Sequence, residues 1–330
     1  MQRPSLKLQF KRADGVARTP TLSSYSFISV AKLSYFYSFC VLVETLAPGA
    51  WPDALTYLPP VLFWFPPLLL WLFSFAGNKT GVALWNLLSL MFVMFVSPFG
   101  LQLVERTQKP MVERPLTILS WNILHGRLGS QEIADYVKQN RPDIALFQET
   151  QESVVMKELQ EALPEYHLVR GGMDLDLAIF SRYPIRVVPS PVEFPGFLMQ
   201  ADAEIGETSL RVLNVHIGKA SKSRTPVRSI WKTTAIHEEA RKALAETLET
   251  VKGPVLLAGD FNAPSAAPLV RKLPLRELRS PGLGGTYPQR FPLWRIDHAL
   301  VSQELNCERV WTDDIGYSDH RPVWLQLTFR

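Results

Sequence analysis

Residues 255–262 read VLLAGDFN, an apolar run that ends in a glycine, an aspartate, a phenylalanine and an asparagine. A short apolar run preceded by Gly253 and Pro254 and followed by polar residues is typical of a buried strand. Asp260 and Asn262, two side chains capable of chemistry, follow it directly. A packed sheet brings such strand-end side chains to one edge, so this stretch predicts a sheet with a functional edge.

The same pattern recurs along the second half of the chain. Amphipathic segments typical of helices lie at 131–138, 154–163 and 230–251, between apolar runs typical of strands. This mixture predicts an α/β layered domain with sheets inside and helices outside. The other strand-like runs are 116–123, 143–147, 175–180, 201–205, 210–217, 296–301 and 323–329.

Polar residues that could carry chemistry follow most of these strands. Singly, each is more often a cap, a turn residue or a hydrogen-bonded structural group. In addition to Asp260 and Asn262 they are Asn122 (SWNILHG), Glu149 (ALFQET), Arg182 (AIFSRYPI), His216 (LNVHIG), Asp297 (RIDHAL), and Asp319 with His320 (YSDHRPV).

In this order and spacing the set resembles the endonuclease/exonuclease/phosphatase superfamily. This is the superfamily of pancreatic-type deoxyribonuclease, neutral sphingomyelinases, inositol-polyphosphate phosphatases and abasic-site endonucleases. The resemblance covers essentially all of 111–330, and the GDFN and SDH motifs that flank RIDH carry it. It implies a four-layer α/β sandwich and a metal-dependent hydrolase of phosphate esters.

The resemblance also implies a metal site and phosphate contacts. Glu149 matches the principal metal-binding carboxylate, with Asn122 beside it and Asp319 next to the metal. Arg182 matches a phosphate contact. Mg²⁺ is the expected ion, with Mn²⁺ as the alternative, because hard divalent cations prefer oxygen ligands.

The remaining motif residues match the catalytic groups. His320 would contact the scissile phosphate or its water, oriented by Asp297, while Asp260 and Asn262 would position the nucleophile and a phosphate oxygen. His216 matches a second histidine of the deoxyribonuclease and sphingomyelinase branches. An acid-oriented histidine suits proton transfer near neutral pH. The residues leave open which histidine is the base, and Asp260 is a further candidate.

The other histidines, His125, His167 and His237, lie outside these motifs and are interpreted as structural or surface residues. The segment 219–232 has five basic residues and no acidic one, and it is interpreted as a solvated loop, with contact to an anionic substrate as the alternative.

The first third of the chain has a different composition. Residues 54–76 and 81–104 hold no charged side chain until their ends, and each exceeds the roughly 20 residues that cross a bilayer. With a weaker run at 26–47, they predict three transmembrane helices within 26–104. A basic tail at 1–25 would be cytoplasmic. The linker 105–115 and the catalytic domain 116–330 would then lie on the extracytoplasmic side.

Charge further narrows the expected substrate. Residues 1–110 hold nine of the 35 basic and four of the 31 acidic residues, so the remainder carries 26 basic and 27 acidic residues. Duplex DNA binding depends heavily on cationic side chains. The favoured prediction is therefore a membrane-tethered phosphoesterase whose phosphodiester or phosphomonoester substrate is lipid-linked or membrane-proximal, such as a lipid headgroup or a polyprenyl pyrophosphate. The alternatives are a surface nuclease and a non-catalytic membrane-anchored binding domain.

The chain has only two cysteines, which excludes a fold held together by a set of disulfide bonds.

Overall fold

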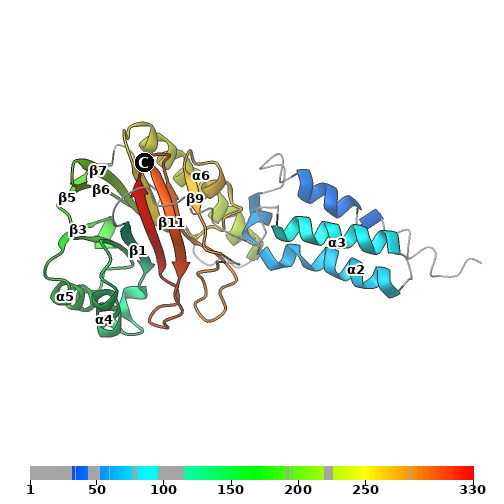
Figure 1. Cartoon of the computed structure of the whole chain (residues 1–330), viewed down its shortest axis with the longest axis horizontal. Coiled ribbons are helices and arrows are strands. Elements are labelled where there is room, and N and C mark those ends of the chain that lie inside the picture. Colours follow the sequence, from blue (N-terminus) through cyan, green and yellow to red (C-terminus); the bar gives the residue numbers. More distant parts are fainter. Residues whose placement is uncertain are drawn as a thin grey trace, which may run out of the picture.

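The computed structural model describes residues 32–33, 35–43, 53–58, 60–76, 80–95, 115–190, 193–194, 196–218, 226–281 and 284–330. Residues 115–330 form the two sheets and the helices that cover them (Figure 1). The described residues of the N-terminal third form helices and no strand.

Two six-stranded sheets form the body of the protein. The first has the order β11-β12-β1-β2-β4-β3, and the second has the order β5-β6-β7-β8-β10-β9. The first sheet consists of β11 (Leu305–Thr312), β12 (Val323–Phe329), β1 (Leu116–Asn122), β2 (Ile144–Gln148), β4 (Leu177–Ser181) and β3 (His167–Gly171). The second consists of β5 (Ile185–Val188), β6 (Gly196–Ile205), β7 (Thr208–Ile217), β8 (Val255–Asp260), β10 (Asp297–Val301) and β9 (Arg276–Leu278).

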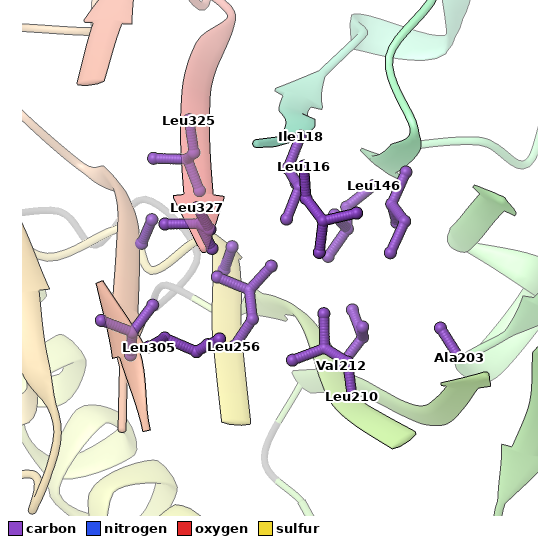
Figure 2. Packing of buried hydrophobic residues seen from close by; sticks show 14 of the residues in the cluster. Leu116, Ile118, Leu146, Ala203, Leu210, Val212, Leu256, Leu305, Leu325 and Leu327 are labelled. Carbon is purple, nitrogen blue, oxygen red and sulfur yellow. The ribbon is translucent and has the colours of Figure 1, made fainter. Parts of the chain in front are cut away.

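Apolar side chains from the two sheets meet in a shared core. Figure 2 shows Ile118 and Leu146 of the first sheet with Val212 and Leu256 of the second, and all four are fully buried. Each such side chain contributes about 1.5–3 kcal/mol relative to exposure. This core fixes one sheet against the other.

Helices cover the outer face of each sheet. α4 (Ser130–Asn140) and α5 (Ser153–Ala162) pack on the first sheet, and α6 (Pro226–Glu249) and α7 (Pro268–Arg271) pack on the second. In α4 the apolar side chains at the start and end of one turn, Ile133 and Val137, are both buried, which is the spacing of an amphipathic helix. The α/β sandwich that the resemblance implies is confirmed: two sheets lie inside and helices cover both outer faces.

The prediction of three transmembrane helices is wrong. In the part of the chain that the structure describes, no helix combines the length and the apolar character needed to cross a membrane. The apolar run 54–76 is divided into η1 (Asp53–Tyr57), η2 (Pro60–Phe63) and α2 (Phe65–Ala76), because its prolines interrupt helical hydrogen bonding. The 12 residues of α2 rise about 18 Å, against the roughly 30 Å of a bilayer core.

The second apolar run gives α3 (Thr80–Phe95), whose 16 residues rise about 24 Å. Of the weaker run 26–47, residues 35–43 are helical. The predicted multi-pass membrane location, with the catalytic domain on the extracytoplasmic side, is therefore corrected as well. The tail 1–25 and nearly all of the linker 105–115 lie outside the described residues.

Candidate active site

Strand direction gathers the motif residues at one edge of the sandwich. In each sheet one pair of strands is parallel, β1 with β2 and β7 with β8, so their C-terminal ends lie side by side. The register pairs His216 with Asp260, and Asp260 with Asp297 on its other side. Because paired residues point to the same face of a sheet, three neighbouring strands present one row of polar side chains.

Two histidines, His216 within this row and His320 beside it, are each oriented by a carboxylate of their own. His320 Nδ1 lies 2.9 Å from Asp297 Oδ2, and His216 Nδ1 lies 2.8 Å from an oxygen of Asp176. In both rings Nδ1 therefore donates to a carboxylate, which leaves Nε2 directed into the site. The two Nε2 atoms are each 3.8 Å from the same atom, Asp260 Oδ2.

The surrounding carboxylates keep both histidines protonated over a wider pH range. Burial lowers the pKa of His320, but Asp297, Asp260 and Asp319 outweigh burial and raise this pKa to about 10. Burial likewise lowers the pKa of His216, and its hydrogen bond to Asp176 and the charges around it produce a net increase. Conversely, burial raises the pKa of Asp260, but the two histidines lower it overall, so Asp260 is ionised.

Amide groups hold the Asp260 carboxylate in place. The backbone N–H of Asn262 donates to Asp260 Oδ1 at 2.8 Å, and the Asn122 side-chain amide donates to Oδ2 at 3.1 Å. The Asn262 side chain donates to the Ile217 carbonyl at 3.0 Å, which ties the turn after β8 to the end of β7. Asn262 adopts a φ of 48°, a left-handed conformation that asparagine tolerates.

The backbone at position 259, directly before Asp260, requires a glycine. Its φ is 142°, and a Cβ at this position would lie 2.0 Å from the backbone oxygen of Val215 on β7. Only glycine allows β7 and β8 to approach this closely next to His216.

Glu149 follows β2 and forms the second part of the site. One of its oxygens accepts from the Asn122 amide at 3.0 Å, and the other lies 3.2 Å from His125 Nε2. The amide nitrogen of Asn122 thus faces two carboxylates, while its oxygen accepts from the Leu124 backbone N–H at 3.1 Å. In this arrangement Asn122 orients the carboxylates of the site.

Asp319 presents a carboxylate oxygen, Oδ1, that is buried without a hydrogen-bond partner. A buried carboxylate oxygen that accepts no hydrogen bond suits a divalent cation. The atoms of Asp260, Asp297 and His320 also lie within 4.8 Å of one another. There, however, both oxygens of Asp297 already face His320 Nδ1, at 2.9 and 3.1 Å. Asp297 is thus already committed to His320, and Glu149 and Asp319 stay the predicted metal ligands.

Sequence reasoning missed two residues of the site. Asp176 precedes β4, which is antiparallel to β2, so its position at the same edge as Glu149 could have been inferred only from the direction of β4. His125, for which the sequence predicts a structural or surface role, contacts Glu149. Its place in the motif NILHG, three residues after Asn122, was the available signal.

Arg182 does not join the site, which corrects the predicted phosphate contact. It follows β4 at the opposite end of the strand and forms an ion pair with Asp143 at 3.2 Å. Asp143 precedes Gln148, the last residue of β2, by five residues. At the rise of an extended strand, this separates Arg182 from the Glu149 end of β2 by about 16 Å. The antiparallel direction of β4 therefore removes Arg182 from the phosphate.

The remaining histidines and the basic segment lie as follows. His167 is exposed on β3, and His237 is buried on α6, so both agree with their interpretation as structural or surface residues. Lys219, Lys222 and Arg224 lie outside the described residues.

The sequence pattern of the Endonuclease/Exonuclease/phosphatase family matches residues 119–320, a range that contains every residue of the site. The chain belongs to this family. It is accordingly a metal-dependent hydrolase acting on phosphate ester bonds. No curated protein matches this chain.

Solved structures share the fold of this endonuclease/exonuclease/phosphatase domain. Humanized D. rerio TDP2 with 14 mutations has a TM-score of 0.51 at 16% identity, over 64% of this chain and 98% of that one. D. rerio TDP2 complexed with a single strand DNA product has a TM-score of 0.50 at 14% identity, over 66% and 100%. A functionally unknown conserved protein from Enterococcus faecalis V583 has a TM-score of 0.50 at 14% identity, over 65% and 100%.

Proposed function

We propose that the chain is a Mg²⁺-dependent phosphoesterase that hydrolyses a phosphodiester or phosphomonoester by direct attack of water. The observation that carries this proposal is the convergence of two acid-oriented histidines, His216 and His320, on one oxygen of Asp260. Proton donors and an ionised acceptor that face one point are what hydrolysis of a phosphate ester requires.

The negative charge of the site supports the binding of a metal ion there. Among the described residues, no lysine or arginine forms an ion pair with any carboxylate of the site. A phosphate group would meet strong repulsion from these acids unless a cation accompanied it. The carboxylates are Glu149, Asp176, Asp260, Asp297 and Asp319.

Glu149 and Asp319 would hold the ion, with Asn122 fixing the Glu149 carboxylate. A bound Mg²⁺ would neutralise phosphate oxygens and so stabilise the charge that develops during hydrolysis. Asn122 also donates to Asp260, so a single amide sets the relative placement of the metal-binding and catalytic carboxylates.

The protein groups divide the proton transfers. His320, whose pKa is raised, holds a proton on Nε2 that it can donate to a phosphate oxygen or to the leaving group. Asp260 is ionised and can accept the proton of an attacking water. His216 faces the same oxygen and is the second candidate for either role, oriented by Asp176 as His320 is by Asp297.

The near-neutral charge of residues 111–330 favours a small or lipid-linked phosphate ester, such as a lipid headgroup or a polyprenyl pyrophosphate, over a nucleic acid. The second candidate function is a nuclease. It is favoured by the shared fold with D. rerio TDP2, which has been solved with a single strand DNA product.

A substrate panel tests these functions. The full chain and His320→Asn, prepared identically, are incubated with sphingomyelin, phosphoinositides, polyprenyl pyrophosphate, single-stranded DNA and plasmid DNA, with Mg²⁺ or with EDTA. We expect hydrolysis of a lipid phosphate ester that requires Mg²⁺ and is lost in the variant. Cleavage of DNA alone would establish the nuclease instead. Hydrolysis that persists in EDTA or in His320→Asn would contradict the proposed mechanism.

A further inference from the structure

Tyr57, the last residue of η1, contacts the catalytic domain at two separate points. Its hydroxyl forms a hydrogen bond with His237 Nδ1 on α6 at 2.5 Å, with the two ring centroids 5.4 Å apart. Its backbone carbonyl accepts from Trp294 Nε1 at 3.3 Å. The ring also packs against the apolar cluster between α6 and the second sheet.

The first contact leads to His216. His237 Nε2 lies 3.1 Å from the Gly218 carbonyl, which can only accept, so Nε2 carries the proton and Nδ1 accepts from the Tyr57 hydroxyl. Gly218 comes two residues after His216, at the end of β7. Tyr57 and His237 together therefore hold the backbone that ends the His216 strand.

The second contact leads to His320. Trp294 and Tyr287 exchange two backbone hydrogen bonds, at 2.9 and 3.0 Å. The Tyr287 ring lies 4.8 Å, centroid to centroid, from the His320 ring. Thr286, which precedes it, accepts from the backbone N–H of Asp297 at 3.2 Å. A shift of Trp294 would therefore reach both His320 and the carboxylate that orients it.

We propose that Tyr57 is a positioning residue of the active site, through which the N-terminal segment sets the placement of both catalytic histidines. The proposal rests on the proposed function in taking His216 and His320 as the catalytic pair. It gives the N-terminal segment a part in catalysis, because two independent chains of contact begin at one of its residues and end at opposite halves of the site.

Two substitutions separate the two chains of contact. Tyr57→Phe removes the hydroxyl that donates a hydrogen bond to His237 Nδ1, and it keeps the ring and the backbone carbonyl. Trp294→Phe removes the donor to that carbonyl. The matched control is Tyr37→Phe, which removes a tyrosine hydroxyl bonded to the Phe63 carbonyl, within the N-terminal segment itself.

The test combines hydrogen–deuterium exchange with steady-state kinetics of the full chain. We expect faster exchange at 212–218 in Tyr57→Phe and at 284–297 in Trp294→Phe, with the strand 116–122 unchanged. We also expect kcat to fall about 10-fold in each variant with KM nearly constant, since misplaced catalytic groups slow the chemical step. Tyr37→Phe should match the wild type in kcat and in exchange at both segments.

Exchange and kcat that stay at wild-type values in both variants would overturn the proposal. Faster exchange with unchanged kcat would also overturn it, because Tyr57 would then be structural only. If the wild type hydrolyses no phosphate ester, the proposed function fails, and exchange alone decides: faster exchange at the two segments supports positioning by Tyr57, and unchanged exchange refutes it.

Discussion

His216 and His320 direct their Nε2 atoms to a single oxygen, Asp260 Oδ2, each from 3.8 Å. The two residues belong to different sheets, since His216 lies on β7 and His320 lies just before β12. Their convergence therefore exists only when the sheets are packed together. The apolar core between the sheets thus sets the geometry of the site as well as the stability of the fold.

The partnership of Asp297 with His320 predicts a change in the pH profile. Asp297→Asn removes the nearest carboxylate, so the pKa of His320 should fall from about 10 toward its ordinary value near 6.5. Because the protonated form is lost above the pKa, the alkaline limb of kcat/KM should move to lower pH, and kcat should fall about 10²- to 10⁴-fold. Asp135→Asn, on the exposed face of α4, is the control. An alkaline limb that stays in place would contradict this assignment.

Asp176 predicts a similar dependence for His216. Asp176→Asn keeps the size of a buried side chain but loses the charge that orients the ring, so kcat should fall about 10- to 100-fold. Asp174, two residues earlier and exposed, offers a matched control in Asp174→Asn. Equal activities of the two variants would show that His216 needs no oriented tautomer.

The bridging amide of Asn122 predicts a metal effect. Asn122→Ala removes the donor to both Glu149 and Asp260, so the Mg²⁺ concentration that gives half-maximal activity should rise about 10- to 100-fold. The measurement is a Mg²⁺ titration of EDTA-stripped enzyme. The control, Asn140→Ala at the end of α4, removes an exposed amide and should not change the titration. An unchanged titration in Asn122→Ala would show that Asn122 does not support metal binding.

Alanine substitution should cost more stability at Gly259 than at Gly206, although both glycines have a positive φ. Gly259→Ala forces a Cβ into the Val215 carbonyl, so the free energy of unfolding should drop by about 2 kcal/mol or more. Gly206, in the turn between β6 and β7, has a φ of 62° but no atom within 4 Å of its added Cβ. Gly206→Ala should therefore cost only about 1 kcal/mol of backbone strain. Urea unfolding of both variants checks the difference, and equal losses would contradict the close approach of β7 and β8.

His237 predicts a pH dependence of stability. Burial lowers its pKa to about 4, so the folded state keeps it neutral while the unfolded chain protonates near pH 6.5. Between pH 7 and pH 5 the unfolded state gains more protons, and His237 alone should remove about 2 kcal/mol of stability. His237→Gln keeps a donor for Gly218 and an acceptor for Tyr57 without titrating. Wild type should lose more stability than this variant over that interval, and parallel losses would refute the shift.

Much of the site followed from the sequence because strand ends are marked by abrupt changes from apolar to polar residues. Asn122, Glu149, His216 and Asp260 lie at the ends of two parallel strand pairs, where such a pattern places them together. Strand ends alone do not place residues on antiparallel strands, and the motifs RIDH and SDH identify Asp297 and His320 instead. The direction of β4 depends on its sheet partners, and it brings Asp176 to the site while moving Arg182 away.

The N-terminal third shows a different limit. Hydrophobicity over 54–76 indicates burial, but it does not report the length of a helix. Prolines divide that run, and α2 begins only at Phe65. Tyr57, within the same run, instead faces α6 of the catalytic domain. That contact depends on residues 180 positions apart, which no local pattern can predict.

The register that pairs His216, Asp260 and Asp297 across three neighbouring strands has a consequence for protein engineering. Strand pairing places the backbone of these three residues, whereas Glu149, Asn262 and His320 lie in the connections beyond the strand ends. A loop exchange in this scaffold therefore has to keep the first residues of the connections after β2 and β8 and the last residues before β12. Grafts confined to the parts of the connections between these residues would leave the reactive side chains in place.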